Sequence, residues 1–195
     1  MTARRTVADV MQQLSEDHRN FARLLAILER QLALFDRAER PDYELLTAIT
    51  DYFTGFPDRC HHPKEDLILR RMREKDPVAT ETVGDLEAEH EKLGERVQRF
   101  KEAVQNVLKE IEMPRSAFDA VLRHFIEDQR QHMLMENERF FPLAQKILTD
   151  KDWAEIDRAV SKEQDPLFGS EAAEEFESLR QSILRWEAED REASG

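Results

Sequence analysis

Two histidines of this chain occupy positions where an amphipathic helix would otherwise place apolar residues. His18 falls within an apolar repeat over residues 14–35, and His90 falls within another over residues 83–111. Both repeats advance by three or four residues, which is the spacing by which a helix buries one face. A buried imidazole is costly unless it is paired, hydrogen-bonded or bound to a metal. We therefore predict that both side chains point into a core and have a partner there.

Two further segments each carry a histidine followed four residues later by a glutamate. These pairs are His61 with Glu65 and His132 with Glu136. Residues four apart lie one helical turn above each other, so each pair can present two ligand atoms to one point. With the two single histidines, the set suits two metal ions, each bound by two imidazoles and bridged by both glutamates. Imidazole with carboxylate favours iron, zinc or manganese, and a set without thiolate argues against a structural zinc finger or an iron–sulfur cluster. A di-iron centre is the predicted site.

The composition indicates one all-helical domain. Only five of the 195 residues are glycine and 36% are charged, which is typical of helices with a period of 3.6 rather than of a sheet. The net charge is −13, with Lys and Arg scattered among acids, so nucleic acid and anionic membrane are not expected partners. No apolar run approaches the roughly 20 residues of a membrane span, and residues 1–10 lack the hydrophobic stretch of a signal peptide. The single cysteine, Cys60, agrees with a reducing compartment and is interpreted as a small buried hydrophobe, so we expect a cytoplasmic protein.

The elements that must position the predicted ligands are four long helices. Ser15 is the expected N-cap of the first, which should end before Pro41. The others are expected at about residues 42–73, from Asp76 and Pro77 to about 112, and after a turn at residues 113–116 to about 148. Pro57 and Pro63 predict a kink beside His61, and Pro142 predicts a bend in the fourth helix.

Short turns between helices of this length predict an up-down-up-down four-helix bundle over residues 1–148. We expect residues 149–195 to form a C-terminal helical extension. Thr149 and Asp152 should open a short helix, residues 165–169 should form a loop, and Ser170 should cap a last helix. That helix has an apolar stripe, which must be covered by another surface. We favour packing on the bundle; the alternative is packing on a second copy in a homodimer. The stripe consists of Phe176, Leu179, Ile183 and Trp186.

The four ligand-bearing segments read DHRNF around His18, HHPKED from His61, EAEHEKL around His90 and HMLMENERFFP from His132. In this order they resemble the hemerythrin-like HHE cation-binding domain, over roughly residues 10–148. The resemblance implies a non-haem di-iron centre in the bundle, with the two irons joined by an oxo or hydroxo bridge. It also implies that the six residues named above are the ligands and that the two glutamates are the bridging ones.

The sequence departs from the oxygen-carrying hemerythrins at Gly94. Those proteins have a second histidine at this position, one turn after the third-helix ligand, so the chain looks more like the iron-cluster-repair and bacterial regulatory branches. Gly94 is expected to leave one iron under-coordinated and open to a small ligand; the alternative is a close helix crossing that needs a small residue. Gln129, one turn before His132, could hydrogen-bond a ligand or metal-bound water, or reach solvent at the bundle end. His62, about 100° from His61 around a regular helix, is expected to make a contact outside the ligand set, and His124 is expected on the surface.

These features predict a di-iron protein that binds oxygen, nitric oxide or peroxide for sensing, scavenging or iron handling under oxidative or nitrosative stress. The enzyme alternative is a ferroxidase, a peroxidase or a nitric oxide reductase that uses the same centre. A third alternative is an iron donor for iron–sulfur cluster repair. In the fourth, the metal only stabilises the bundle.

Overall fold

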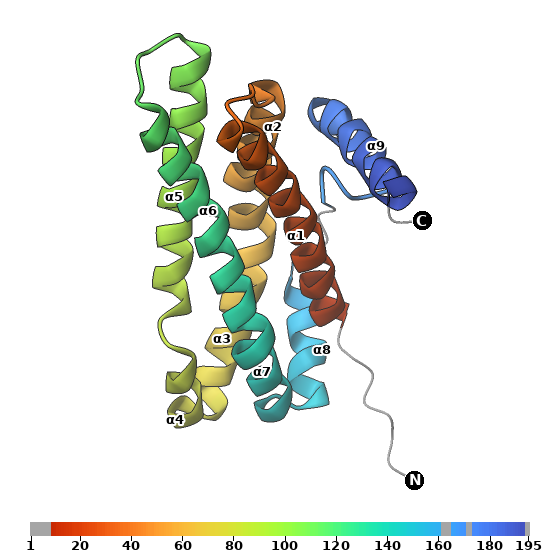
Figure 1. Cartoon of the computed structure of the whole chain (residues 1–195). Helices are drawn as coiled ribbons and strands as arrows, with labels where there is room; N and C mark the ends of the chain where they lie inside the picture. The colour runs from red at the N-terminus through yellow and green to blue at the C-terminus, as the bar shows by residue number, and fades with distance from the viewer. Residues whose placement is uncertain (1–8, 161–164, 171–172, 194–195) are drawn as a thin grey trace.

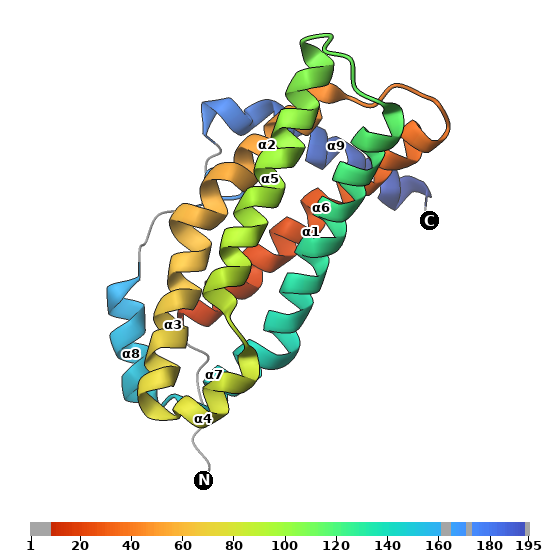
Figure 2. The same cartoon turned by 90° about the vertical axis from the view of Figure 1, so that its left-hand side faces the viewer.

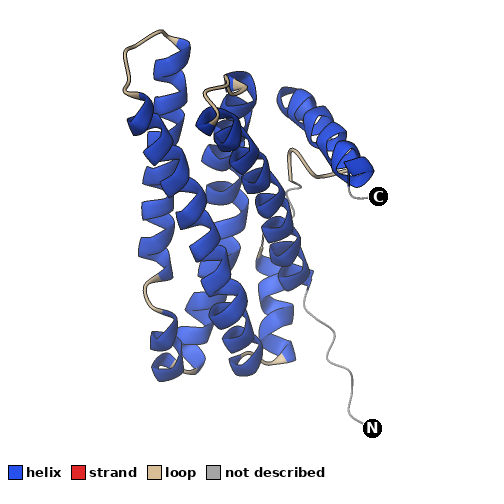
Figure 3. Cartoon of the chain, viewed as in Figure 1, coloured by secondary structure: helices blue, strands red, loops and turns tan. Residues whose placement is uncertain are grey.

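The computed structural model describes residues 9–160, 165–170 and 173–193 of the chain. Within these ranges every regular element is helical (Figure 3). Four helical rods run side by side along the long axis, with the chain passing up, down, up and down through them (Figure 1). The predicted all-helical bundle with additional C-terminal helices is confirmed.

The first rod is α1 (Asp9–Asp36), and it begins earlier than predicted. Ser15 is not an N-cap, because its hydroxyl donates to the Met11 carbonyl one turn back at 2.7 Å, inside the helix. Val10 and Met11 are buried and continue the apolar stripe by one more turn. The burial of these residues therefore outweighs the capping preference of serine at this point.

The second rod consists of α2 (Tyr43–Phe56), a π-helical turn (Pro57–His61) and α3 (His62–Lys75). Asp42 caps α2 by accepting a hydrogen bond from the Leu45 amide at 3.0 Å. The kink predicted from the two prolines takes the form of the π-helical turn, which ends at His61. A proline lacks the amide that closes a regular turn, and π-helical turns are frequent at functional sites.

The third rod begins later than predicted. Asp76 does cap a helix, accepting from the Ala79 amide at 2.9 Å, but α4 (Pro77–Thr80) and a 3₁₀ turn (Glu81–Val83) last only to Gly84. Gly84 has φ +85°, a left-handed conformation that glycine adopts without a steric penalty, and it breaks the helix. Asp85 then accepts from the Ala88 amide at 3.2 Å and caps the long helix α5 (Leu86–Leu108).

The fourth rod consists of α6 (Arg115–Met135), a π-helical turn (Glu136–Phe140) and α7 (Phe141–Ile147), so the predicted bend lies just before Pro142. The next helix, α8 (Asp150–Ala159), packs beside α1 and α3 at the lower end of the bundle in Figure 1. It opens with the predicted capping pair, in which Thr149 and Asp152 exchange hydrogen bonds.

The last helix, α9 (Glu177–Ala193), follows a 3₁₀ turn (Glu174–Phe176). It therefore starts later than the predicted Ser170 cap would require; residues 171–172 lie outside the described part. Three of the stripe residues, Phe176, Leu179 and Ile183, are at most 6% exposed and join the core beside α2. In the described ranges, no helix has the length and apolar character needed to cross a membrane.

The apolar core consists of two clusters with a layer of polar side chains between them. The larger cluster packs the upper parts of α1, α2, α5 and α6 together with α9, and the smaller one packs the start of α1 with α3, α7 and α8 (Figure 2). His18 lies between Leu14 of the smaller cluster and Phe21 of the larger one. The predicted ligands thus lie at one level of the bundle, where all four rods cross from one cluster to the other.

Candidate metal centre

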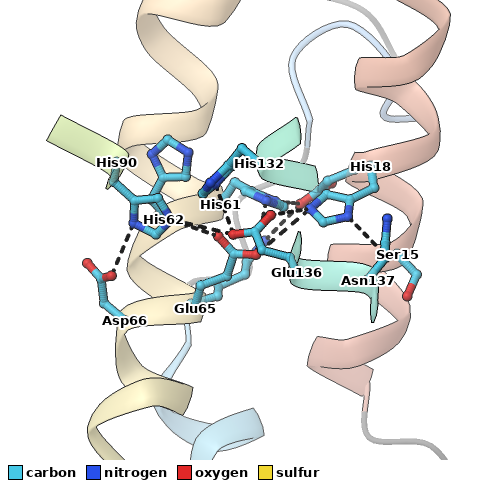
Figure 4. A network of polar contacts seen from close by, with 12 residues as sticks. Ser15, His18, His61, His62, Glu65, Asp66, His90, His132, Glu136 and Asn137 are labelled. Atoms are coloured by element: carbon cyan, nitrogen blue, oxygen red, sulfur yellow. Dashed lines mark hydrogen bonds and ion pairs between the residues drawn. The ribbon is translucent and has the colours of Figure 1, made fainter. Parts of the chain in front are cut away.

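The structure brings the six predicted ligands together at this polar level (Figure 4). Glu65 and Glu136 are 0% exposed, and the four histidines are at most 7% exposed. Candidate ligand atoms form two groups, and the atoms within each group lie within 4.8 Å of one another. The group that we call the His18 half comprises His18, His61, Glu65 and Glu136, and the group that we call the His90 half comprises His62, Glu65, His90 and His132.

Each glutamate faces both halves. One oxygen of Glu65, Oε1, lies 3.4 Å from His61 Nε2 and 3.8 Å from His18 Nε2, whereas Oε2 lies 3.4 Å from His90 Nε2. Likewise Glu136 Oε2 lies 3.2 Å from His18 Nε2, and Oε1 lies 2.9 Å from His132 Nε2. Such a division is the one needed by a carboxylate that bridges two ions.

The other ring nitrogen of each histidine, Nδ1, faces an oxygen on the outer side of the layer. In the His18 half, Nδ1 of His18 lies 3.1 Å from Asn137 Oδ1, and Nδ1 of His61 lies 3.0 Å from Asp17 Oδ2.

In the His90 half, Nδ1 of His90 lies 3.2 Å from an Asp66 oxygen, and Nδ1 of His132 lies 3.5 Å from a Glu89 oxygen. A metal-bound histidine usually has such a partner, which fixes the ring and leaves Nε2 for the metal.

The electrostatics of the layer require positive charge. Burial and the Glu136 carboxylate raise the pKa of Glu65, but His61 and His90 outweigh them and hold this pKa at about 2. Burial lowers the pKa of His61, but Glu65 and Asp17 outweigh burial and raise it to about 10. Two ionised carboxylates thus draw protons, or another cation, into a buried region.

A metal fits this demand because most of the inward-facing atoms have no hydrogen-bond partner. In the described part of the chain, both oxygens of Glu65 and of Glu136 are buried without a hydrogen bond, as is Nε2 of His18, His90 and His132. Buried polar atoms are normally satisfied, and leaving a charged one unmet costs several kcal/mol. Nitrogen and carboxylate donors converging on two points therefore suit two cations.

The family model of the hemerythrin HHE cation binding domain matches residues 9–144. The chain belongs to this family. No curated protein and no solved structure matches it. The matched range contains both halves of the centre, so the family's cation-binding function and the geometry of this hemerythrin-like bundle point to the same metal-binding layer.

Gly94 lies on α5 one turn after His90. A Cβ built at this glycine would have only Asp58 Oδ2 within 4 Å among the described atoms outside its own helix, at 3.9 Å. Packing there does not require a glycine, so a close helix crossing does not explain it. The role of Gly94 as a ligand entry point stays a prediction.

Three further residues singled out in the sequence differ in how deeply they are buried. Gln129 is 8% exposed and therefore does not reach solvent, while its contact with a bound ligand or water stays a prediction. His124 is exposed, as predicted. Cys60 is 1% exposed and packs in the larger cluster, in agreement with its interpretation as a buried hydrophobe.

The residue that sequence reasoning undervalued is His62. It is 9% exposed, and its ring stacks on that of His90 with centroids 4.0 Å apart, so the predicted interhelix contact is present. One of its nitrogens also belongs to the His90 half. The prolines around the HH doublet were the available signal, because an angle of 100° between neighbours holds only in a regular α-helix.

Two hollows lead toward the centre from outside. One, of about 280 Å³ between α5 and α6, reaches His132 and is lined by Glu89, Lys92 and Met135 among others. A larger one, of about 730 Å³, reaches Asp17 and Lys64 but none of the six ligands. The His90 half therefore lies closer to solvent.

Proposed function

We propose that this hemerythrin-like protein holds two non-haem iron ions and binds oxygen, nitric oxide or peroxide there. The six predicted residues would be ligands, with Glu65 and Glu136 bridging the irons alongside an oxo or hydroxo group. The observation that carries the proposal is the division of each buried glutamate between two groups of histidines, with no hydrogen-bond partner for its oxygens.

Iron is favoured because the ligand set combines imidazole with carboxylate and contains no thiolate. Bound there, iron would supply a redox-active ion with a coordination position for a small ligand. The protein itself would orient the histidine ligands and exclude water from them. Asn137 and Asp17 orient the histidines of the His18 half, and the rings of Phe21 and Phe141 lie 4.9 Å from His61 and 5.2 Å from His18, respectively.

We infer a cytoplasmic role in sensing, scavenging or iron handling under oxidative or nitrosative stress. The ligands lie between residues 18 and 136, so residues 149–195 would form a separate extension that adds no ligand. A chain with a net charge of −13 is unsuited to nucleic acid as a partner.

The test is metal analysis of anaerobically purified protein, together with optical spectra before and after air, nitric oxide and peroxide. We expect two irons per chain and a spectral change with at least one of these ligands. If the protein holds two metals but its spectrum does not respond to air, nitric oxide or peroxide, the metals have only a structural role. Protein that takes up less than one iron per chain would refute the di-iron proposal.

The hollow that reaches His132 supports a second candidate, an iron donor for iron–sulfur cluster repair. A donor should lose iron to a chelator within minutes while the bundle stays folded, whereas a tight sensor or scavenger should not. An enzyme, by contrast, should consume many equivalents of peroxide or nitric oxide per centre. A binding protein should stop at a stoichiometric adduct.

A further inference from the structure

His62 follows the predicted ligand His61 directly, at the point where the π-helical turn passes into α3. Both rings face the polar layer. The ring of His62 lies 4.0 Å from that of His90, nearly parallel at 11°, and 6.1 Å from that of His132. A nitrogen of His62 lies within 4.8 Å of ligand atoms of Glu65, His90 and His132, which is the same limit that joins the six predicted residues.

The outer side of His62 matches the outer side of His18 and His61, the two histidines of the other half. Its Nδ1 lies 3.1 Å from Asp58 Oδ1, as the Nδ1 atoms of His61 and His18 lie 3.0 and 3.1 Å from Asp17 and Asn137. An oxygen on Nδ1 fixes the ring and leaves Nε2 as the nitrogen with a free lone pair. His62 thus shares with His18 and His61 an oxygen on Nδ1, and its ring needs only to turn out of the stack on His90 for both Nε2 atoms to reach one ion, whereas His124 is exposed on the surface.

The Asp58–His62 pair lies against the position where α5 has no side chain. A Cβ at Gly94 would be 3.9 Å from Asp58 Oδ2, and Gly94 is one turn after His90 on the same helix. A side chain at residue 94 could therefore approach the His90 half from α5. In this chain the approach from that side is made by His62, which belongs to α3.

We propose that His62 is a fifth histidine ligand and binds the ion of the His90 half, an inference that rests on the proposed two-metal centre. That ion then has three histidines and both glutamates, and the ion of the His18 half has two histidines and both glutamates. This assignment moves the predicted entry point away from Gly94.

The decisive experiment compares His62→Ala, the double variant His62→Ala with Gly94→His, and the control His124→Ala. Each is titrated with Fe²⁺ and with Co²⁺ under anaerobic conditions against a competing chelator. We expect His62→Ala to weaken one of two binding steps by more than the roughly 10–100-fold typical of losing a hydrogen-bond partner to a ligand. The double variant should recover most of this loss, because it returns an imidazole to the same ion from α5, and His124→Ala should bind like the parent.

The outcomes distinguish failure of the His62 assignment from failure of the two-metal proposal on which it rests. Two unchanged binding steps in His62→Ala would overturn the ligand role and leave the two-metal centre intact. Fewer than two binding steps in the parent would instead refute the centre itself. X-ray absorption of the iron-loaded parent needs no variant to fold: scattering from five imidazoles over two irons supports the inference, and scattering from four contradicts it.

Discussion

The two halves of the centre differ in what surrounds them. The His18 half is enclosed by Phe21 and Phe141, and its histidines are held by Asn137 and by Asp17, whose side chain is only 8% exposed.

The carboxylates that face the His90 half are nearer to solvent. Their side chains are 32% exposed for Asp66, 45% for Glu89 and 51% for Asp58.

This difference indicates a division of roles within one layer. Partly exposed carboxylates and a hollow at His132 bring the His90 half nearer to solvent, so under the proposed function ions would exchange from this side. Aromatic rings beside His18 and His61 would limit water at the His18 half under the proposed function, which would strengthen electrostatic interactions with a small ligand there. If the halves differ in this way, variants at their ligands and at the partners of those ligands should affect the two halves unequally.

Replacing Glu136 with Ala should have the largest effect, because its two oxygens face opposite halves. We expect both ions to be lost on desalting, so that the metal content falls below one per chain. Glu65→Ala should behave in the same way. Metal analysis of the folded variants, with His124→Ala as the control, checks this expectation. A Glu136→Ala protein that keeps one tightly bound ion would show that the halves are independent.

Asp17→Asn should weaken metal binding more than Asp58→Asn. The Asp17 carboxylate is buried against His61, and it also lies 3.8 Å from the ammonium of Lys64, whose side chain is 5% exposed. Removing its charge should lower affinity by roughly 10–100-fold. Water can replace part of the half-exposed Asp58, so the corresponding loss should be smaller. Chelator competition measures both, and the reverse order would contradict the contrast between a dry half and a solvated half.

Truncation after Gly169 should leave both halves intact. It removes Phe176, Leu179 and Ile183, which are buried beside α2 and contact no ligand. Burial of each such side chain contributes about 1.5–3 kcal/mol, so we expect a melting temperature lower by roughly 10 °C and poorer solubility. Metal content and the optical spectrum should not change. Loss of metal in the folded truncated protein would show that α9 shapes the centre.

Asp152→Ala should have the smallest effect on the metal centre and a modest effect on the stability of the fold. Asp152 is 1% exposed, caps α8 with Thr149 and pairs with Arg71 and Lys75 of α3. Losing the cap should cost about 1–2 kcal/mol of unfolding free energy at neutral pH. Glu155→Ala, which removes a more exposed partner of Arg71, is the matched control and should cost less.

The contribution of Asp152 to the unfolding free energy should depend on pH. Burial raises the pKa of Asp152, but hydrogen bonds from Thr149, Lys75 and Arg71 outweigh it and lower this pKa below its ordinary value. The folded state thus favours the ionised form, so the stabilisation is present above a pH of about 4 and is lost as the pH falls further. Urea unfolding of parent and variant from pH 3 to pH 7 should show the difference between them shrinking at the acid end. A constant difference would mean that the charge contributes nothing.

The sequence predicted which side chains meet in the buried polar layer, because the signal for them is local. A histidine on an apolar stripe, or a histidine and glutamate four residues apart, depends only on helical register, which the burial of His18, His61, Glu65 and Glu136 follows. The kink beside His61 was equally local, since a proline removes a donor wherever it occurs.

The wrong predictions depended on information from elsewhere in the fold. Ser15 failed as a cap because Val10 and Met11 pack on distant helices, and the third helix started late because Gly84 turns the chain with a positive φ. The interhelix contact predicted for His62 is present, but the sequence did not predict its approach to the His90 half, because a π-helical turn changes the angle between neighbouring residues.

The polar layer also has a consequence for folding, since it splits the apolar core of the bundle in two. Without a metal, the two clusters are separated by a layer in which the oxygens of both buried glutamates lack hydrogen-bond partners. Cooperative unfolding units follow contiguous packing, so the metal-free chain should open its smaller cluster, near Leu14, Ile68 and Phe141, before the larger one. Amide hydrogen exchange should then resolve two protection levels along the same helix α1. Metal binding should merge these levels into one, because ligands on all four rods would tie the two clusters into a single cooperative unit.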